Sequence, residues 1–262
     1  MTETLILYHA HHSTCSQKVR ICLAEKQLAW QPRLIDLGAK QQLEPDYLRI
    51  NPNGVVPTLV HDGEAIVDSS VICEYLDEVF PKPALSPADP AARARMRAWM
   101  RYIEEVPTVA VRYPSFNMAF LNRYDGLDDK GFLDQQADVR PLRREFFRTM
   151  SRHGFDDSEI EAALENTRKT VERMAAALDN TAWLAGDSFS LADIVMAPLI
   201  DRMDDLGFAG IWADLGTVKD WFARIKARKS FGQAFYKGTR LSELHDLKPA
   251  LKSKRLAGEA AS

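Results

Sequence analysis

The sequence predicts a chain of two structural classes, an α/β domain at the N-terminal end followed by an all-α domain. Three observations carry this prediction. Within residues 1–80, short apolar segments alternate with amphipathic ones, as strands and helices do. A segment with four prolines, Pro81, Pro83, Pro87 and Pro90, interrupts that pattern. Beyond it, apolar residues recur at helical spacing. The expected parts are an α/β domain at 1–80, a linker at 81–92, a helical domain at 93–240 and a flexible tail at 241–262.

The first domain is predicted in the order β-α-β-(α)-β-β-α, which is typical of a thioredoxin-like unit. Strands are expected at short apolar runs bounded by turn residues, and helices where apolar residues recur every three or four positions. An Asp62-Gly63 turn between the last two strands indicates a hairpin. The expected strands are 5–8, 31–36, 58–60 and 65–67, and the expected helices are 15–26, 44–48 and 68–79.

The second domain is predicted to be helical throughout. Its best-defined helix start is Ser190, because Asp193 three positions later completes a capping box. The other expected helices span 91–113, 135–150, 159–178 and 221–236.

The bulk composition excludes several classes of function. The chain has 262 residues, of which 46% are apolar and 27% charged, as in ordinary globular proteins. A net charge of −3 argues against a dedicated nucleic-acid surface. Three cysteines give no disulfide framework and suit a reducing cytosol. The first residues lack the pattern of a secretory leader, and no apolar run approaches the roughly 18 residues of a membrane helix. We therefore expect a cytoplasmic protein without nucleic-acid or membrane partners.

The segment from Asn51 to Leu59 is the most informative part of the chain. Proline has no N–H for a central sheet ladder, so Pro57 at the start of a strand indicates a bend, and we expect a cis Val56–Pro57 bond. Such a bend leaves the main chain of Val56 free to pair with a visiting peptide. Asp68 and Ser69 then begin a helix, and helix N-termini bind carboxylates. Together these features predict a site for a small, extended, acidic peptide.

The order NPNGVVPTLVHDG, followed by VDSS and far downstream by WLAGDSFSLADI, resembles the glutathione S-transferase superfamily over nearly the whole chain. The resemblance implies the fold of that family, glutathione as co-substrate and a homodimer. An extra stretch at about 122–157, with the run RREFFRTMSRHGFDDSEIEAAL that begins in it at Arg143, resembles the bacterial glutathione-dependent β-aryl-etherases, as do SVICEYL at 70–76 and the Phe80-Pro81 pair. That branch cleaves lignin-derived aryl ethers.

The chemistry of glutathione requires a thiolate, whereas a free thiol is only a few per cent ionised at pH 7. A hydroxyl or thiol at the start of the first helix can supply the stabilising hydrogen bond, and Ser13, Thr14, Cys15 and Ser16 are all candidates. The run is similar to the Ser-Ser-Cys-Ser of the zeta class, which assigns activation to Ser13. Alignment with the bacterial beta class favours Cys15, and alignment with the etherase branch favours Ser16. We favour Ser13 and keep the others open.

The rest of the glutathione site is implied by the same resemblance. Val56, held by Pro57, would pair its main chain with the cysteinyl unit. Ser69 would bind the γ-glutamyl carboxylate, and Asp68 the α-ammonium. Gln42 would reach the glycyl carboxylate, with Lys40 as an alternative on chemical grounds.

The electrophile pocket is expected between the first loop and the first long helix of the second domain. Flat apolar ligands suit aromatic walls. Near this place lie two histidines and a cluster of aromatic and amide side chains: His9, His12, Tyr113, Phe116, Asn117 and Phe120. His11 completes a histidine-rich loop, but without Cys or Asp partners at ligand spacing we expect no metal.

Three functions remain open on the sequence. The first is a glutathione transferase that attacks a hydrophobic aromatic electrophile, with β-aryl ether cleavage as its most specific form. The second is a glutathione-dependent isomerase, or a thiol-disulfide reductase that uses Cys15. The third is a non-enzymatic binding protein of the same fold.

Overall fold

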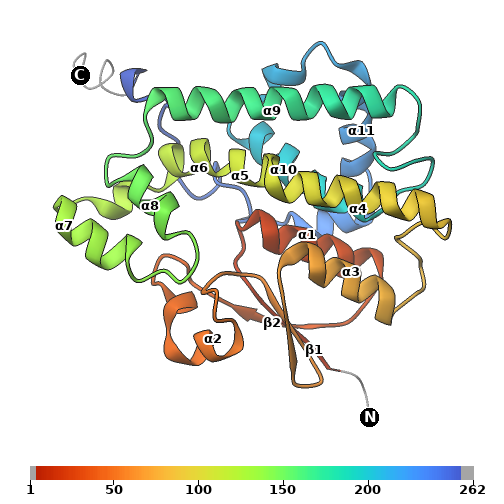
Figure 1. The fold of residues 1–262 in the computed structure, drawn as a ribbon, viewed down its shortest axis with the longest axis horizontal. Helices are drawn as coiled ribbons and strands as arrows, with labels where there is room; N and C mark the ends of the chain where they lie inside the picture. The colour runs from red at the N-terminus through yellow and green to blue at the C-terminus, as the bar shows by residue number, and fades with distance from the viewer. Residues whose placement is uncertain (1–3, 255–262) are drawn as a thin grey trace.

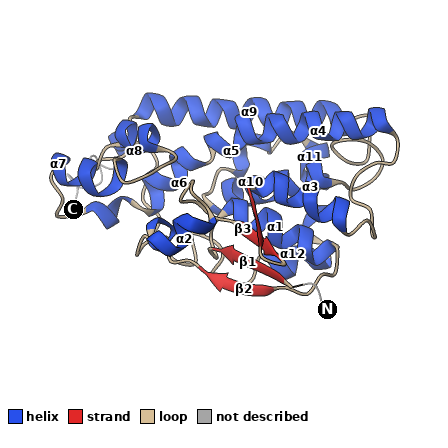
Figure 2. Ribbon diagram, turned by 60° about the horizontal axis from the view of Figure 1, so that its bottom comes forward, coloured by secondary structure: helices blue, strands red, loops and turns tan. Residues whose placement is uncertain are grey.

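The computed structural model describes residues 4–254. A four-stranded sheet organises the first domain, in the order β2-β1-β3-β4 (Figure 2). β1 (Leu5–His9) runs parallel to β2 (Gln31–Leu34) and antiparallel to β3 (Thr58–His61). β4 (Glu64–Val67) pairs antiparallel with β3. The predicted hairpin is confirmed, because the Asp62 and Gly63 φ angles of 48° and 92° suit a two-residue turn between twisted strands.

The helices of this domain lie close to their predicted positions. They are α1 (Thr14–Glu25), α2 (Pro45–Ile50) and α3 (Ser69–Val79), with a 3₁₀ turn at Gln41–Leu43 before α2. α1 and α3 pack against each other and lie between the sheet and the helices α4 and α10 of the second domain (Figure 1). The N-terminus of α1 therefore lies at the boundary between the two domains.

The second domain is helical, as predicted. Its elements, after the proline-rich segment, are α4 (Pro90–Glu105), α5 (Pro107–Ala110), α6 (Arg112–Ala119), α7 (Asp129–Phe132), α8 (Arg144–Met150), α9 (Asp157–Leu178), α10 (Leu191–Asp205), α11 (Gly216–Lys226) and α12 (Lys229–Ala234). Short 3₁₀ turns lie at Leu121–Tyr124 and Ala209–Trp212, and a π-helical turn at Leu133–Ala137.

Three predicted helices were too long. The helix expected at 91–113 ends at Glu105, because Pro107 cannot donate the next helical hydrogen bond. The helix expected at 135–150 exists only from Arg144, since the chain passes through a π-helical turn and Pro141 first. The helix expected at 221–236 divides at Arg228, whose backbone is extended. Local periodicity alone did not reveal these breaks.

The capping box at Ser190 is confirmed and lies in the core. The Asp193 carboxylate accepts hydrogen bonds from the Ser190 N–H at 3.0 Å and from the Leu184 N–H at 3.1 Å. The Trp221 indole N–H donates to the same carboxylate at 2.8 Å. Asp193 therefore joins the start of α10 to the preceding loop and to α11.

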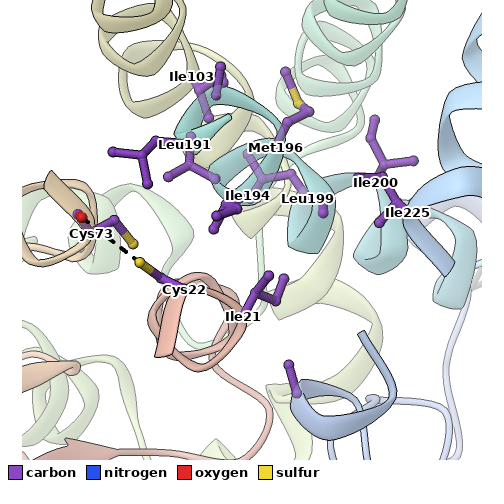
Figure 3. Close-up of a cluster of buried hydrophobic side chains, with 14 of the residues drawn as sticks. Ile21, Cys22, Cys73, Ile103, Leu191, Ile194, Met196, Leu199, Ile200 and Ile225 are labelled. Atoms are coloured by element: carbon purple, nitrogen blue, oxygen red, sulfur yellow. Dashed lines mark hydrogen bonds between the residues drawn. The ribbon is translucent and has the colours of Figure 1, made fainter. Parts of the chain in front are cut away.

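One hydrophobic core runs through both domains. Figure 3 shows Ile21 and Cys22 of α1 and Cys73 of α3 next to α10, where Leu191, Ile194 and Leu199 point toward them. The Cys22 thiol donates to the Cys73 carbonyl at 3.8 Å, so both cysteines act as buried packing residues. The domains consequently share apolar surface and are not two independent units joined by a linker.

The C-terminal segment to Lys254 is packed, which corrects the expectation of a flexible tail from 241. Leu241 is buried, the Lys248 N–H donates to the Met118 carbonyl at 2.9 Å, and the Asn117 side-chain amide donates to the Ala250 carbonyl at 2.9 Å. Apolar residues within this polar segment provide the contacts. Residues 255–262 of the predicted tail lie outside the described part. Between residues 4 and 254, no helix combines the length and apolarity needed to cross a bilayer.

Candidate active site

A cavity of about 410 Å³ lies where the two domains meet. Its wall is formed by the N-terminus of α1, by the segments 37–42 and 54–56 of the first domain, and by side chains of α6, α10 and residues 135–147 of the second. The volume is within the range of small-molecule sites. Eight of the residues predicted for the site line it: His12, Ser13, Thr14, Cys15, Gln42, Val56, Phe116 and Phe120.

Ser13 occupies the N-cap of α1. Its Oγ accepts a hydrogen bond from the Ser16 N–H at 3.2 Å, which uses a lone pair and leaves the hydroxyl proton for an acceptor in the cavity. The partial positive charge at the start of α1 acts at the same place. A single serine can therefore cap the helix and donate to an anion.

The other three candidates for thiol activation differ in position. Thr14 and Cys15 line the cavity beside Ser13. Ser16 is fully buried, its Oγ accepts a hydrogen bond from the Ala10 N–H at 3.3 Å, and it is not part of the cavity wall. The geometry thus brings three of the four predicted residues to the cavity and assigns Ser16 a structural hydrogen bond in the loop after β1.

The bend before β3 has the form expected from the sequence. Val56–Pro57 is cis, as predicted. The Val55 carbonyl accepts hydrogen bonds from the Tyr47 hydroxyl at 2.6 Å and the Asn51 amide at 2.9 Å. By contrast, neither the N–H nor the C=O of Val56 has a hydrogen-bond partner within residues 4–254, and Val56 lines the cavity. Pro57 is buried behind it. Free main chain is therefore presented to a ligand.

Gln42 is a second unsatisfied group in the same wall. Only 3% of this residue is exposed, and its Oε1 has no hydrogen-bond partner among the described residues. Lys40 also lines the cavity, but its Nζ donates to the Gln135 carbonyl at 3.1 Å. A buried amide oxygen without a partner is unfavourable, so Gln42 is the better placed of the two for a ligand that carries a hydrogen-bond donor.

Asp68 and Ser69 lie at the start of α3 and outside the wall of this cavity. Asp68 Oδ1 accepts hydrogen bonds from the Ser70 N–H at 2.9 Å and the Val71 N–H at 3.1 Å, so the carboxylate caps α3. A γ-glutamyl subsite at this helix remains a prediction.

The three histidines of the first loop point in different directions. His9 is buried against the Trp30 ring at 5.3 Å and away from the cavity. His11 bonds the Tyr236 hydroxyl through Nδ1 at 2.6 Å. His12 alone lines the cavity. Burial, and next Arg202, lower the pKa of His12 to about 3, so its imidazole is neutral at physiological pH. Within residues 4–254, no three His, Cys, Asp or Glu side chains come together to hold a metal.

Helix α6 presents two different faces, and this separates the predicted substrate residues. Phe116 and Phe120, one turn apart, line the cavity. Tyr113 packs against the Phe155 ring at 4.2 Å, on the face that enters the second core cluster. Asn117 lies on that face too and clamps the chain, donating to the Phe155 carbonyl at 3.0 Å. Tyr113, Asn117 and His9 are thus structural in this geometry, a correction to the predicted substrate contacts.

The sequence did not predict the arginines of this cavity. Side chains of α6, of the 121–124 turn, of the segment before α8 and of α10 contribute them: Arg112, Arg123, Arg140, Arg143 and Arg202. They are far apart in the sequence, so only the fold brings them together. The one signal was the arginine-rich stretch RREFFR, but periodicity could not show that Arg143 would face the cavity.

Comparison with known proteins agrees with this fold. A model of the glutathione S-transferase N-terminal domain matches residues 7–84, and a model of the glutathione S-transferase C-terminal domain matches residues 139–229. A chain with this thioredoxin-like unit and this helical domain belongs to the glutathione S-transferase family.

Individual relatives lie at moderate identity. The protein LigF of Sphingobium sp. strain SYK-6 is 29% identical over 244 residues, covering 90% of this chain and 95% of LigF. The crystal structure of β-etherase LigF matches with a TM-score of 0.80 and 28% identity, over 88% of this chain and 98% of that one. A stringent starvation protein A homologue of Pasteurella multocida is 31% identical and covers 84% of each chain. A tetrachloro-p-hydroquinone reductive dehalogenase of Sphingobium chlorophenolicum is 26% identical, over 87% of this chain and 94% of that protein.

Proposed function

We propose that this protein is a glutathione transferase whose glutathione thiolate attacks a hydrophobic aromatic electrophile, and that the reaction is cleavage of a lignin-type β-aryl ether. One observation carries the proposal. Ser13 at a helix N-terminus, the unpaired main chain of Val56 and the rings of Phe116 and Phe120 all line one cavity. The likeness to LigF, whose structure is described as that of a β-etherase, supports the specific reaction.

Glutathione would bind along the first-domain side of the cavity. Its cysteinyl unit would pair with the N–H and C=O of Val56 as an added strand. The glycyl end would extend toward Gln42, whose free Oε1 accepts the glycyl N–H, with its side-chain amide near the carboxylate. The γ-glutamyl end would extend toward Asp68 and Ser69 at the start of α3.

The proposed reaction is a displacement at the carbon that bears the aryl ether. Ser13 donates a hydrogen bond to the sulfur, and the start of α1 stabilises its negative charge. The thiolate forms a C–S bond as the C–O bond breaks, and the electron pair leaves with the phenolate oxygen. Phe116 and Phe120 hold the aromatic ring in line with the sulfur.

The first experiment measures binding and turnover separately. We expect isothermal titration calorimetry to give a dissociation constant for glutathione below the millimolar range. We also expect the release of 4-methylumbelliferone from its β-aryl ether to depend on glutathione, with the thioether product identified by mass spectrometry. Glutathione binding without thioether formation from this ether or from activated aryl halides would contradict the transferase proposal. No binding of glutathione would favour a non-enzymatic module of the same fold.

A thiol-disulfide function is the second candidate, and the position of Cys15 favours it. Cys15 lines the cavity, as do Arg143 and Arg202, and positive charges beside a cysteine favour its thiolate form. A mixed disulfide with oxidised glutathione, detected by intact-mass measurement and absent from Cys15→Ser, would support this function. Loss of aryl conjugation in Ser13→Ala, with Cys15→Ser still active, would support the transferase.

We also propose a cytoplasmic homodimer. Val71 and Val79 on α3 are 45% and 40% exposed, large values for apolar side chains, and a partner chain could cover them. Light scattering coupled to gel filtration measures the mass directly. A mass of one chain at micromolar concentration would contradict the dimer.

A further inference from the structure

The wall of the cavity on the side of the helical domain is strongly cationic. Five arginines line the cavity together with Lys40, whereas Asp125 is the one carboxylate among the described lining residues. Arg202 has partners, since it donates to the His12 carbonyl and to the Ser115 hydroxyl at 3.4 Å. The cavity arginines therefore differ in whether the protein supplies their hydrogen-bond partners. Those without such partners are the ones available to a ligand.

Four of the five cavity arginines, Arg112, Arg123, Arg140 and Arg143, form no ion pair within residues 4–254, although ion pairs are common elsewhere on this chain, for example between Arg148 and Asp138 at 2.8 Å. Of the four, Arg123 has the Asp36 carboxylate near enough to oppose the lowering of its pKa by burial. The Nε of Arg140 is buried without a hydrogen-bond partner among the described residues. The Arg140 guanidinium lies over the Phe147 ring at 3.8 Å, so its flat face is covered and its edge remains available.

The Arg143 guanidinium is repelled by both Arg112 and Arg140. Burial, followed by the charge of Arg112, lowers the pKa of Arg143 to about 10, and Arg140 acts in the same direction. Burial likewise lowers the pKa of Arg140. The three side chains are half-buried. Like charges in such a place are unfavourable without partners, and a bound anion would relieve the repulsion and supply the missing partner of Arg140 Nε.

A complex of the protein with glutathione and electrophile could offer these arginines two kinds of anion, the carboxylates of glutathione or an anionic group of the electrophile. The position of the arginines in the cavity bears on which of the two they bind. Glutathione carries two carboxylates, but its expected contacts, Val56 and Gln42, lie on the first-domain side of the cavity. Arg112 is one turn from Phe116 on α6, and Arg140 stacks on Phe147 of α8. Arg112 and Arg140 thus lie beside aromatic rings of this wall, and Arg140 is also close enough to Lys40 for its charge to add to burial in lowering the pKa of that lysine.

We propose that the electrophile is an aromatic compound with a permanent anionic group, such as a ring carboxylate, which Arg112, Arg140 and Arg143 bind. The inference rests on the proposed transferase function and specifies its substrate class. Guanidinium groups match carboxylates in a planar, bidentate geometry, and the ring then stacks against Phe116 and Phe120. A neutral ligand of equal size would leave the arginines unpaired.

The test compares two matched electrophiles, 4-chloro-3,5-dinitrobenzoate and the corresponding benzamide. In both, the glutathione thiolate forms a C–S bond as the C–Cl bond breaks and chloride leaves. Rates are divided by the uncatalysed rate with glutathione, which removes the difference in intrinsic reactivity. We expect kcat/KM, so corrected, to favour the carboxylate at least tenfold, and the preference to shrink as salt concentration rises.

Variants identify the residues responsible. Arg140→Gln and Arg143→Gln should each reduce the preference for the carboxylate at least tenfold. Arg148→Gln is the matched control on α8, because Arg148 is exposed, pairs with Asp138 and does not line the cavity. It should keep the preference, and circular dichroism checks that all variants fold. Equal use of carboxylate and amide by the unaltered protein would overturn the proposal.

A binding experiment separates this inference from the proposed reaction. Titration with unreactive 4-nitrobenzoate and 4-nitrobenzamide requires no turnover. One outcome is that neither aryl chloride reacts with glutathione, while 4-nitrobenzoate binds more tightly than 4-nitrobenzamide and Arg143→Gln removes that difference in affinity. This outcome would support the anion site and contradict the proposed transferase reaction. If Arg143→Gln instead weakens glutathione binding and leaves 4-nitrobenzoate unaffected, the arginines bind glutathione and the inference is wrong.

Discussion

At the scale of single residues, side chains at the start of α1 both cap the helix and offer a hydrogen-bond donor to the cavity. Ser13 caps the helix through its oxygen and keeps its proton for the cavity. Ser16, three positions on, is turned into the protein and bonds the Ala10 N–H. Hydroxyl groups that look equivalent in the sequence are therefore distinguished by which side of the first helical turn they occupy.

Replacing Ser13 by Ala should lower the rate of conjugation strongly and the stability of the protein only slightly. The loss of a hydrogen bond to an anion should lower kcat/KM for conjugation by about 10²-fold, or about 2.7 kcal/mol, at neutral pH. The loss of the N-cap should lower the free energy of unfolding by only about 1 kcal/mol. The pH profile of conjugation is the decisive measurement, and its thiol pKa should shift upward in Ser13→Ala. An unchanged profile would exclude Ser13 as the donor.

His9, which is buried, and His12, which is half-buried, should make the protein sensitive to acid. Burial, followed by Arg20, lowers the pKa of His9 to about 3, and burial followed by Arg202 does the same for His12. The folded state therefore holds both neutral, while the unfolded chain takes up protons below about pH 6.5. Their contribution to stability is complete above that pH and declines as pH falls toward 3, by up to about 1.4 kcal/mol per pH unit for each histidine.

Urea unfolding at pH 7, 6 and 5 measures this effect. His12→Gln should have a smaller loss of unfolding free energy between pH 7 and 5 than the unaltered protein, because one titrating group is removed. His153→Gln is a suitable control, since His153 is exposed on the surface. Equal pH dependence in His12→Gln and the unaltered protein would show that His12 titrates normally in the folded state.

At the scale of elements, the start of α10 is the most strongly specified point of the helical domain. Asp193 is fully buried, and Ser190, Leu184 and Trp221 all donate hydrogen bonds to it. Burial raises the pKa of this carboxyl, and the hydrogen bonds oppose that shift. An ordinary capping box has thus become the polar junction between a loop and two helices.

Asp193→Ala should be much more damaging than removal of a surface cap. It leaves the Trp221 indole N–H and two backbone N–H groups buried without their acceptor, so we expect a loss of about 3–5 kcal/mol. For a protein of this size the melting temperature should fall by roughly 10 °C. Ser190→Ala, which leaves the carboxylate in place, should cost about 1 kcal/mol. Equal losses of melting temperature for the two variants in calorimetry would show that Asp193 acts only as a helix cap.

At the scale of the whole molecule, the two domains are held together by buried polar contacts as well as by the core of Figure 3. The Lys18 side chain of α1 is fully buried and donates to Glu104 Oε1 of α4 at 2.6 Å and to the Thr108 hydroxyl at 3.0 Å. The active-site cavity lies at the same boundary. Its geometry therefore depends on how the domains pack.

Glu104→Ala should leave the Lys18 ammonium buried without its carboxylate and lower the free energy of unfolding by about 3 kcal/mol. The double variant Lys18→Met with Glu104→Leu should recover most of this loss, because it removes both charges. Because both domains share one core, urea unfolding should show coincident transitions by tryptophan fluorescence and circular dichroism. A stable intermediate with one domain folded would contradict a core shared by the two domains.

The sequence predicted much of the fold. The hairpin, the cis Val56–Pro57 bond and the Ser190 capping box depend on residues adjacent in the chain, so local chemistry sufficed. Of the predicted site residues, Ser13, Gln42 and Val56 line the cavity, and their roles toward a ligand stay predictions. It failed to separate Phe116 from Asn117, because a one-residue step on a helix changes the face, and only packing decides which face is buried.

The sequence by itself determined the family, the order of the elements in the first domain and the bend before β3, because each is encoded by short-range patterns of turn, cap and apolar residues. Only the tertiary structure decided the character of the cavity. Arg112, Arg140 and Arg143 line the same cavity although they are distant in the sequence or on different elements, and their effect on one another depends on this proximity and on their partial burial. Long-range proximity and desolvation are properties of the folded chain, and no local pattern records them.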